Sequence, residues 1–299
     1  ASAKFKKIPI FRNFKEEQEL FMPRPLMNII NGGAHANNSL KIQEFMIRPE
    51  SSKSFHESVR ICFLIIQKLK IILEKKNHPT TVGDEGGFAP SLSNNEEAIE
   101  LILESIDDAG FKPGSDVTIC LDVAANELYR DGKYSIRSSD FESSDRIIEY
   151  YKDLVKEFPI SSIEDPFFED DWDAFSSFKK SLKELNSHIQ IVGDDLFVTN
   201  RERLIKGINK KAASAILIKP NQIGTVSETI EVIEYAHSKG FNTIMSHRSG
   251  DTEDTFIADF AVGMNCSQIK TGSLSRSERV SKYNRLIKIE EELGKTTKM

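Results

Sequence analysis

The chain has 299 residues, which exceeds the usual size of one domain, yet a single (β/α)8 barrel needs about 250 residues, so one large domain fits the length. Hydrophobic residues make up 39% and charged residues 29%, a balance that excludes disordered and fibrous proteins. The net charge of −6 gives no electrostatic reason to bind nucleic acid or an anionic membrane. We therefore expect a small-molecule partner.

Cysteine spacing and apolar runs indicate a reducing compartment and no membrane span. Cys62, Cys120 and Cys266 are scattered and have no CxxC spacing. The apolar runs, such as residues 61–66, are much shorter than the roughly 20 residues that cross a bilayer. The first residues lack the apolar core of a signal peptide and do not begin with Met, which we interpret as a processed or truncated start.

The first expected elements are two strands followed by two helices. Residues 26–30 and 42–47 are short apolar runs bounded by Pro, Gly or Asn, which predicts strands. Residues 54–76 and 95–109 show longer apolar patterns without Pro or Gly, and Gly110 closes the second. Such patterns are typical of helices.

From residue 118 onward, strand-like runs alternate with helical stretches. The runs are TICLDVA, ISSIEDP, IQIVGDD, SAILIKP, NTIMSHR and SQIKTG. Helices are expected near residues 140–157, 173–185, 201–208, 226–239, 255–263 and 277–293. These six units and the two earlier strands make eight strands, which predicts an α/β fold, a TIM barrel with the element order ββαα(βα)6. No linker between domains is readable.

Charged or polar residues end six of the strand-like runs. They are Asp122, Glu164, Asp194, Lys219, His247 and Lys270. In a barrel, the carboxyl ends of the strands open on one face, where the loops build the active site. A single charged strand end also arises where a strand simply reaches solvent, but six in phase favour a shared site.

The types of these residues predict metal-assisted acid–base chemistry. Asp122, Glu164 and Asp194 are hard oxygen donors, which suit Mg²⁺ better than zinc. A lysine beside a divalent cation has its charged form disfavoured, so Lys219 or Lys270 is a candidate base. The alternative for these lysines is a structural salt bridge to the carboxylates.

Three loop motifs supply further candidates. GDEGGF places Glu85 in a glycine-flanked turn, which lets the backbone approach a ligand closely. HRSG places the Arg248 cation beside the Ser249 hydroxyl, a pair suited to holding phosphate, although a solvated loop uses the same residues. NGGAHA places His35 after the first strand, where a lone histidine is more often structural.

The motifs together resemble the enolase family in their order, their spacing and their amino-acid identities. They are NGGAHANN, QEFMIRP, VGDEGGFAPSL, LDVAANELY, IEDPF, GDDLFVTN, LIKPNQIGT, SHRSGDTEDTFIADFAVG and QIKTGSLSRSERVSKYN. The resemblance runs from about residue 23 to residue 294, and the last motif is closer to bacterial than to animal enolases. SHRSGDTED and IKPNQIGT are its most specific parts.

The resemblance implies a phosphopyruvate hydratase, a lyase that reversibly dehydrates 2-phosphoglycerate to phosphoenolpyruvate in glycolysis and gluconeogenesis with Mg²⁺. Lys219 then corresponds to the base at C2 and Glu85 to the acid at the C3 hydroxyl. Asp122, Glu164 and Asp194 correspond to the magnesium ligands. The substrate-binding positions that it implies are His35, Gln43, Glu44, Glu164, Asp194, His247, Arg248, Ser249 and Lys270.

Two features depart from the family pattern. Asn126 replaces a common Ser, and the smaller α+β domain that precedes the barrel in enolases has no counterpart. We interpret residues 1–20 as a remnant of the link from that domain and residues 21–299 as the catalytic barrel. For the full-length protein the family implies a homodimer or larger assembly, a cytoplasmic location and, by analogy, a secreted or cell-surface fraction.

Two other functions are left open by the sequence. One is a catalytically impaired enolase fragment that acts only as a binding protein, because the absent domain carries a loop that closes over the substrate. The other is a different acid lyase of the enolase superfamily, although such relatives lack the GDEGG and SHRSG wording. Magnesium-dependent formation of phosphoenolpyruvate separates these alternatives from an active enolase.

Overall fold

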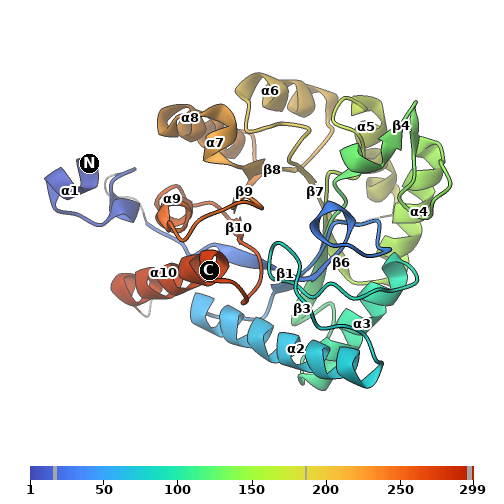
Figure 1. Ribbon diagram of the computed structural model, residues 1–299. Coiled ribbons are helices and arrows are strands. Elements are labelled where there is room, and N and C mark those ends of the chain that lie inside the picture. The colour runs from blue at the N-terminus through green and yellow to red at the C-terminus, as the bar shows by residue number, and fades with distance from the viewer. Residues whose placement is uncertain (16–18, 186, 295–297) are drawn as a thin grey trace.

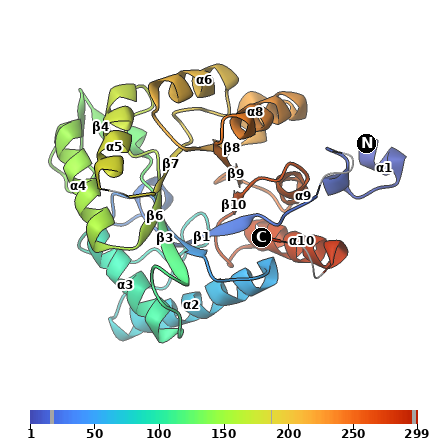
Figure 2. The ribbon, with the colours of Figure 1, turned by 180° about the vertical axis from the view of Figure 1, so that it is seen from behind.

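The computed structural model describes residues 1–15, 19–185, 187–294 and 298–299. Eight strands close into a barrel in the order β1-β10-β9-β8-β7-β6-β3-β2, with helices around its outside (Figures 1 and 2). The strands are β1 Arg24–Asn31, β2 Glu44–Pro49, β3 Val117–Asp122, β6 Ile160–Glu164, β7 Gln190–Gly193, β8 Ala215–Ile218, β9 Asn242–Ser246 and β10 Gln268–Lys270. The expected α/β TIM barrel is confirmed.

The long helices follow the expected positions closely. They are α2 Phe55–Lys75, α3 Asn95–Asp108, α4 Ser144–Glu157, α5 Trp172–Glu184, α6 Arg201–Lys210, α8 Val226–Ser238, α9 Phe256–Gly263 and α10 Ser277–Leu293. Side-chain caps explain several starts: Ser54, Asn94 and Thr225 each accept a hydrogen bond from the backbone N–H three residues later.

Several short elements were not expected from the sequence. They are α1 Ser2–Lys6, α7 Pro220–Ile223, the 3-10 turns η1 Ile10–Arg12, η2 Gly33–His35 and η3 Ala125–Leu128, and the ribbon of β4 Tyr129–Arg130 with β5 Lys133–Tyr134. The helix expected from residue 140 begins only at Ser144, because Tyr134 pairs with Glu142 and extends the ribbon. Short elements of this kind are set by tertiary packing more than by residue periodicity.

β2 runs antiparallel to both of its neighbours, whereas all other neighbouring strands of the barrel are parallel. A parallel pair needs a crossover of about a dozen residues or more, usually a helix, and the β1–β2 connection contains only η2. The reversed direction brings the amino end of β2 to the face where the other strands have their carboxyl ends. Glu44 is consequently paired with Asp122 of β3.

An apolar layer fills the middle of the barrel. It consists of Leu26, Met46, Cys120, Val192, Ala215, Leu217 and Ile244, all buried. Because strand side chains alternate between the two faces, residues two positions from this layer also point inward. On the side where the other strands have their carboxyl ends and β2 has its amino end, these positions hold Glu44, Asp122, Asp194 and Lys219. The layer therefore separates a charged site from the other end of the barrel.

The segment before β1 packs on the outside of the barrel. Phe14 lies against Phe256 and Phe260 of α9, with ring centroids 6.2 and 4.8 Å apart. The assignment of residues 1–20 to a link stays a prediction. Cys62, Cys120 and Cys266 are buried free thiols. Within the described residues, no helix combines the length and the apolar character needed to cross a membrane.

Candidate active site

A cavity of about 290 Å³ opens at the carboxyl ends of the barrel strands. Its lining residues are His35, Gln43, Glu44, Glu85, Asp122, Ala124, Glu127, Asp165, Asp194, Asp195, Lys219, Ser246, His247, Arg248, Ser249 and Lys270. The predicted site residues are all among them except Glu164, which is buried next to Lys270. Residues from every part of the chain that carried a motif thus meet in one place.

A larger cavity of about 530 Å³ lies at the opposite end of the barrel. It is lined there by Arg24 and Arg48, both paired with Glu50, and by the amides of Gln190 and Gln268. These groups already satisfy one another and include no cluster of carboxylates with an amine. The volume of a cavity alone therefore does not identify the end of the barrel that holds the candidate active site.

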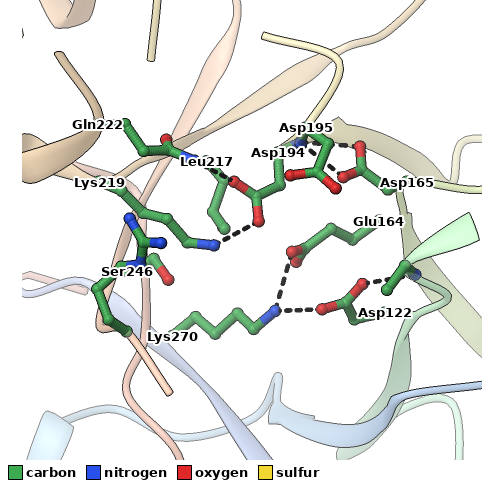
Figure 3. A network of polar contacts seen from close by, with 12 residues as sticks. Asp122, Glu164, Asp165, Asp194, Asp195, Leu217, Lys219, Gln222, Ser246 and Lys270 are labelled. Carbon is green, nitrogen blue, oxygen red and sulfur yellow. Dashed lines mark hydrogen bonds and ion pairs between the residues drawn. The ribbon is translucent and has the colours of Figure 1, made fainter. Parts of the chain in front are cut away.

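Lys270 compensates three buried carboxylates. Its Nζ donates to Asp122 Oδ2 at 2.7 Å and to Glu164 Oε1 at 2.9 Å (Figure 3). The same Nζ lies 3.0 Å from Glu44 Oε1. Strand register explains this cluster, because Glu44 pairs with Asp122 and Asp122 pairs with Glu164 on neighbouring strands. Burial opposes the charge of Lys270, but the carboxylates outweigh it and hold the pKa of this lysine well above its usual value.

Lys219 follows β8 and forms an ion pair with Asp194, which follows the neighbouring strand β7 (Figure 3). Gln222 Nε2 donates to the other oxygen of Asp194 at 3.3 Å. Burial lowers the pKa of Lys219, yet the Asp194 carboxylate outweighs burial and raises it above the usual value. The salt bridge considered for this lysine is therefore present, and the Asp194 carboxylate favours the charged form of Lys219.

Asp194 also belongs to a second cluster of carboxylates. One carboxylate oxygen from each of Asp165, Asp194 and Asp195 lies within 4.8 Å of the other two. Asp165 has the left-handed φ of 40° and accepts hydrogen bonds from the backbone N–H groups of Asp194 and Asp195 at 2.9 and 2.7 Å. These bonds orient the two carboxylates toward the cavity.

The donor set fits a hard divalent cation. Glu164 Oε2 is buried and accepts no hydrogen bond from the described residues, which leaves a carboxylate oxygen free for a ligand. An unsatisfied buried acceptor is costly unless something fills its place. Oxygen donors from carboxylates are the ligands that Mg²⁺ prefers.

Glu85 and Glu44 are two buried acids that both lie beside His35. His35 Nδ1 lies 3.9 Å from Oε1 of each carboxylate. Burial raises the pKa of Glu85, but the neighbouring His247 ring and the charge of Lys270 outweigh it and hold that pKa well below its usual value. For Glu44, burial and then the Glu85 charge hold the pKa well above its usual value.

Glycines allow the turn that carries Glu85. Gly86 has φ of 83°, which side chains rarely adopt, and a Cβ on Gly87 would lie 2.6 Å from Asn31 Oδ1. Asn28 Nδ2 then donates to Glu85 Oε2 at 3.2 Å. The glycines therefore let the loop pack closely against β1, and the expected approach of its backbone to a ligand stays a prediction.

The HRSG loop presents its polar residues to solvent above the cavity. Arg248 and Ser249 are exposed, and Arg248 Nη1 donates to Asn221 Oδ1 at 3.0 Å. His247 is buried, and its Nε2 lies 3.1 Å from Glu85 Oε1. An exposed arginine and hydroxyl next to a buried anionic pocket suit an anionic group of a substrate.

Several site residues escaped the sequence reasoning. Asp195 is the second of two consecutive acids after β7, and this pattern could have identified it. Asn126, noted only as a departure, donates through Nδ2 to Glu169 Oε2 and Asp195 Oδ2, both at 2.9 Å. Arg279 had no local signal, because its contacts are with residues distant in sequence.

The fold and the site define a (β/α)8-barrel enzyme with a cluster of carboxylates and lysines among its βα-loops. Residues 19–299 match the family model described as the enolase C-terminal TIM barrel domain. The chain is 59% identical over 298 residues to Enolase of Pelagibacter ubique (strain HTCC1062), an alignment that covers 100% of this chain and 70% of that relative. The chain belongs to the enolase family. Enolases are lyases of glycolysis and generally depend on magnesium, and this barrel domain fits that function.

Proposed function

We propose that this chain catalyses the reversible dehydration of 2-phosphoglycerate to phosphoenolpyruvate at the cavity above the apolar layer. The observation that carries the proposal is the meeting of Lys219, Glu85 and the buried carboxylates in one cavity of about 290 Å³. The family membership supports the same substrate class.

Lys219 is the proposed base for the C2 proton. It directly follows β8 and is partly buried, and its Nζ lies in the cavity beside Asp194. Removal of the C2 proton requires the neutral amine, so the Asp194 contact must weaken when the site is loaded. Asp122, Glu164 and Asp194 are the proposed magnesium ligands, and bound magnesium supplies positive charge that stabilises the negative charge developing on the substrate.

Glu85 is the proposed acid for the departing C3 hydroxyl. Glu85 belongs to the loop beside β1, and Phe88 of the same loop pairs with Ile30. The base on β8 and this acid are therefore separated by β9 and β10 around the barrel. Separate positions allow one group to remove the proton from C2 while the other delivers a proton to the hydroxyl that leaves C3.

Arg248 and Ser249 are the proposed contacts for the phosphate, and His35, Gln43, His247 and Lys270 complete the proposed substrate shell. Arginine and hydroxyl donors match phosphate oxygens. The carboxylate end of the substrate then faces the interior of the cavity, where Lys219, Lys270 and two of the proposed magnesium ligands lie. By family analogy we also propose a cytoplasmic location and a homodimer or larger assembly for the full-length protein, which light scattering would test.

The experiment is an assay of phosphoenolpyruvate formation, followed by its ultraviolet absorbance with and without Mg²⁺. Magnesium-dependent product formation that is lost in Lys219→Ala supports the proposal. Binding of 2-phosphoglycerate without turnover would favour a binding protein. Proton exchange in another carboxylic acid, with no phosphoenolpyruvate formed, would favour a different acid lyase of the superfamily.

A further inference from the structure

A fully buried guanidinium lies behind the proposed site. Arg279, near the start of α10, is 0% exposed, and its closest carboxylate contact among the described residues is Glu278 Oε1 at 3.9 Å from Nε. Burying an arginine without a close anion is costly unless its N–H groups meet acceptors. The acceptors that it contacts therefore indicate why it is there.

Arg279 joins the two loops that carry the proposed acid and the phosphate contacts. Nη1 donates to Arg248 O at 2.7 Å, and Nη2 donates to Ser249 O at 2.6 Å and to Asp84 O at 3.2 Å. The loop that carries Glu85 is held further by Ser273 N, which donates to Glu85 O at 2.9 Å. One guanidinium thus links the backbone that precedes Glu85 to the backbone of Arg248 and Ser249.

The space for this side chain is made by Gly272. A Cβ on Gly272 would lie 2.7 Å from Arg279 Cδ and 2.7 Å from Glu85 O, and the φ of Gly272 is 75°. Tyr283 of α10 also donates to Gly272 O at 2.7 Å. The glycine turn, α10 and the Glu85 loop are therefore one packed unit around Arg279.

The remaining contact of Arg279 determines the protonation of His247. Nη1 lies 2.6 Å from His247 Nδ1, and a guanidinium only donates hydrogen bonds, so Nδ1 accepts. The partner of one ring nitrogen decides which nitrogen holds the proton. The proton of the neutral ring is then on Nε2, which lies 3.1 Å from Glu85 Oε1.

We propose that Arg279 is a positioning residue that keeps His247 neutral, with its proton on Nε2, and so leaves Glu85 free to take up and deliver a proton. A doubly protonated His247 would place an N–H against an N–H of Arg279. It would also form a full ion pair with Glu85 and hold that carboxyl in its charged form. The effect on turnover rests on the proposed role of Glu85 as acid.

The charged groups facing His247 are Glu85, Arg279 and Lys270. Glu85 favours the imidazolium, whereas Arg279 and Lys270 oppose it, as does burial. Removal of Arg279 takes away one opposing charge and the donor at Nδ1. A proton on Nδ1 then becomes favourable, because the Glu85 carboxylate already faces the other nitrogen.

The test is ¹⁵N NMR of the histidine rings in the whole chain, compared for the wild type, Arg279→Met and Arg279→Lys. His247→Gln assigns the signal. Lys282→Met is the matched control, because Lys282 is equally buried on α10 and donates to Thr252 O and Glu278 O without touching His247. This measurement needs no substrate.

We expect an unprotonated Nδ1 in the wild type, a protonated Nδ1 in Arg279→Met at pH 7, and no change in Lys282→Met. Arg279→Lys keeps a charge and donors and should restore much of the wild-type signal. Dehydration should fall about 100-fold in Arg279→Met, as for misplaced catalytic groups, while exchange at C2 falls much less.

A protonated Nδ1 in the wild type would overturn the proposal even if Arg279→Met does not fold. So would an unprotonated Nδ1 in a folded Arg279→Met variant. If the ring signals change as expected but the wild type forms no phosphoenolpyruvate, the positioning role stands and the proposed function fails.

Discussion

Lys270 on β10 donates to the Asp122 carboxylate on β3 at 2.7 Å, although β1 and β2 lie between these strands in the barrel. The same ammonium contacts Glu164 and Glu44, and all four side chains are nearly fully buried. Three carboxylates this close would repel one another strongly in a medium of low dielectric constant. One lysine therefore makes the acidic end of the barrel compatible with folding.

Lys270→Met should destabilise the fold, because it leaves buried carboxylates without their cation. Breaking a buried ion pair by removing one partner costs about 3–5 kcal/mol, and we expect a loss of that size in the free energy of unfolding. Urea unfolding at pH 7 without Mg²⁺ measures it. Lys183→Met, at an exposed position of α5, is the control. A loss as small as in the control would show that Lys270 does not offset these charges.

Magnesium should stabilise the folded chain. A ligand that binds only the folded state adds about 2.7 kcal/mol when its concentration is 100 times its Kd. We expect the melting temperature to rise with Mg²⁺, and the rise to vanish in Asp122→Asn, Glu164→Gln and Asp194→Asn. Asp173→Asn, at an exposed position, should respond like the wild type. If all three variants keep the response, the metal binds elsewhere.

Lys219→Ala should abolish exchange of the C2 proton of 2-phosphoglycerate, because the variant lacks the amine that removes it. Metal binding should persist, since Lys219 is not a proposed ligand. Deuterium incorporation followed by NMR measures the exchange, and the magnesium-dependent melting temperature reports the metal. Exchange at the wild-type rate would exclude Lys219 as the base.

Glu85→Gln should permit exchange at C2 but suppress dehydration, since the acid acts on the leaving hydroxyl. A general acid typically contributes about 100- to 10,000-fold, so we expect dehydration to fall within that range. Equal loss of both steps in Glu85→Gln would contradict separate roles for base and acid.

Much of the fold followed from local patterns. Short apolar runs bounded by Pro, Gly or Asn predicted the strands, and the structure shows that caps such as Ser54 and Thr225 begin helices, because both features depend on residues within a few positions. The alternation of side chains along a strand put Asp122, Asp194 and Lys219 two residues after the apolar layer. Their common face was therefore predictable before any contact was known.

The reversed direction of β2 and the partners of the buried charges depended on tertiary structure. Lys270 and Asp122 are separated by 148 residues, and Arg279 and Asp84 by 195. The sequence determined which residue types stand at the strand ends, since that is a local property of each strand. Only closure of the barrel decided that Lys270 neutralises three acids and that Arg279 meets Nδ1 of His247, because such pairings depend on packing between distant segments.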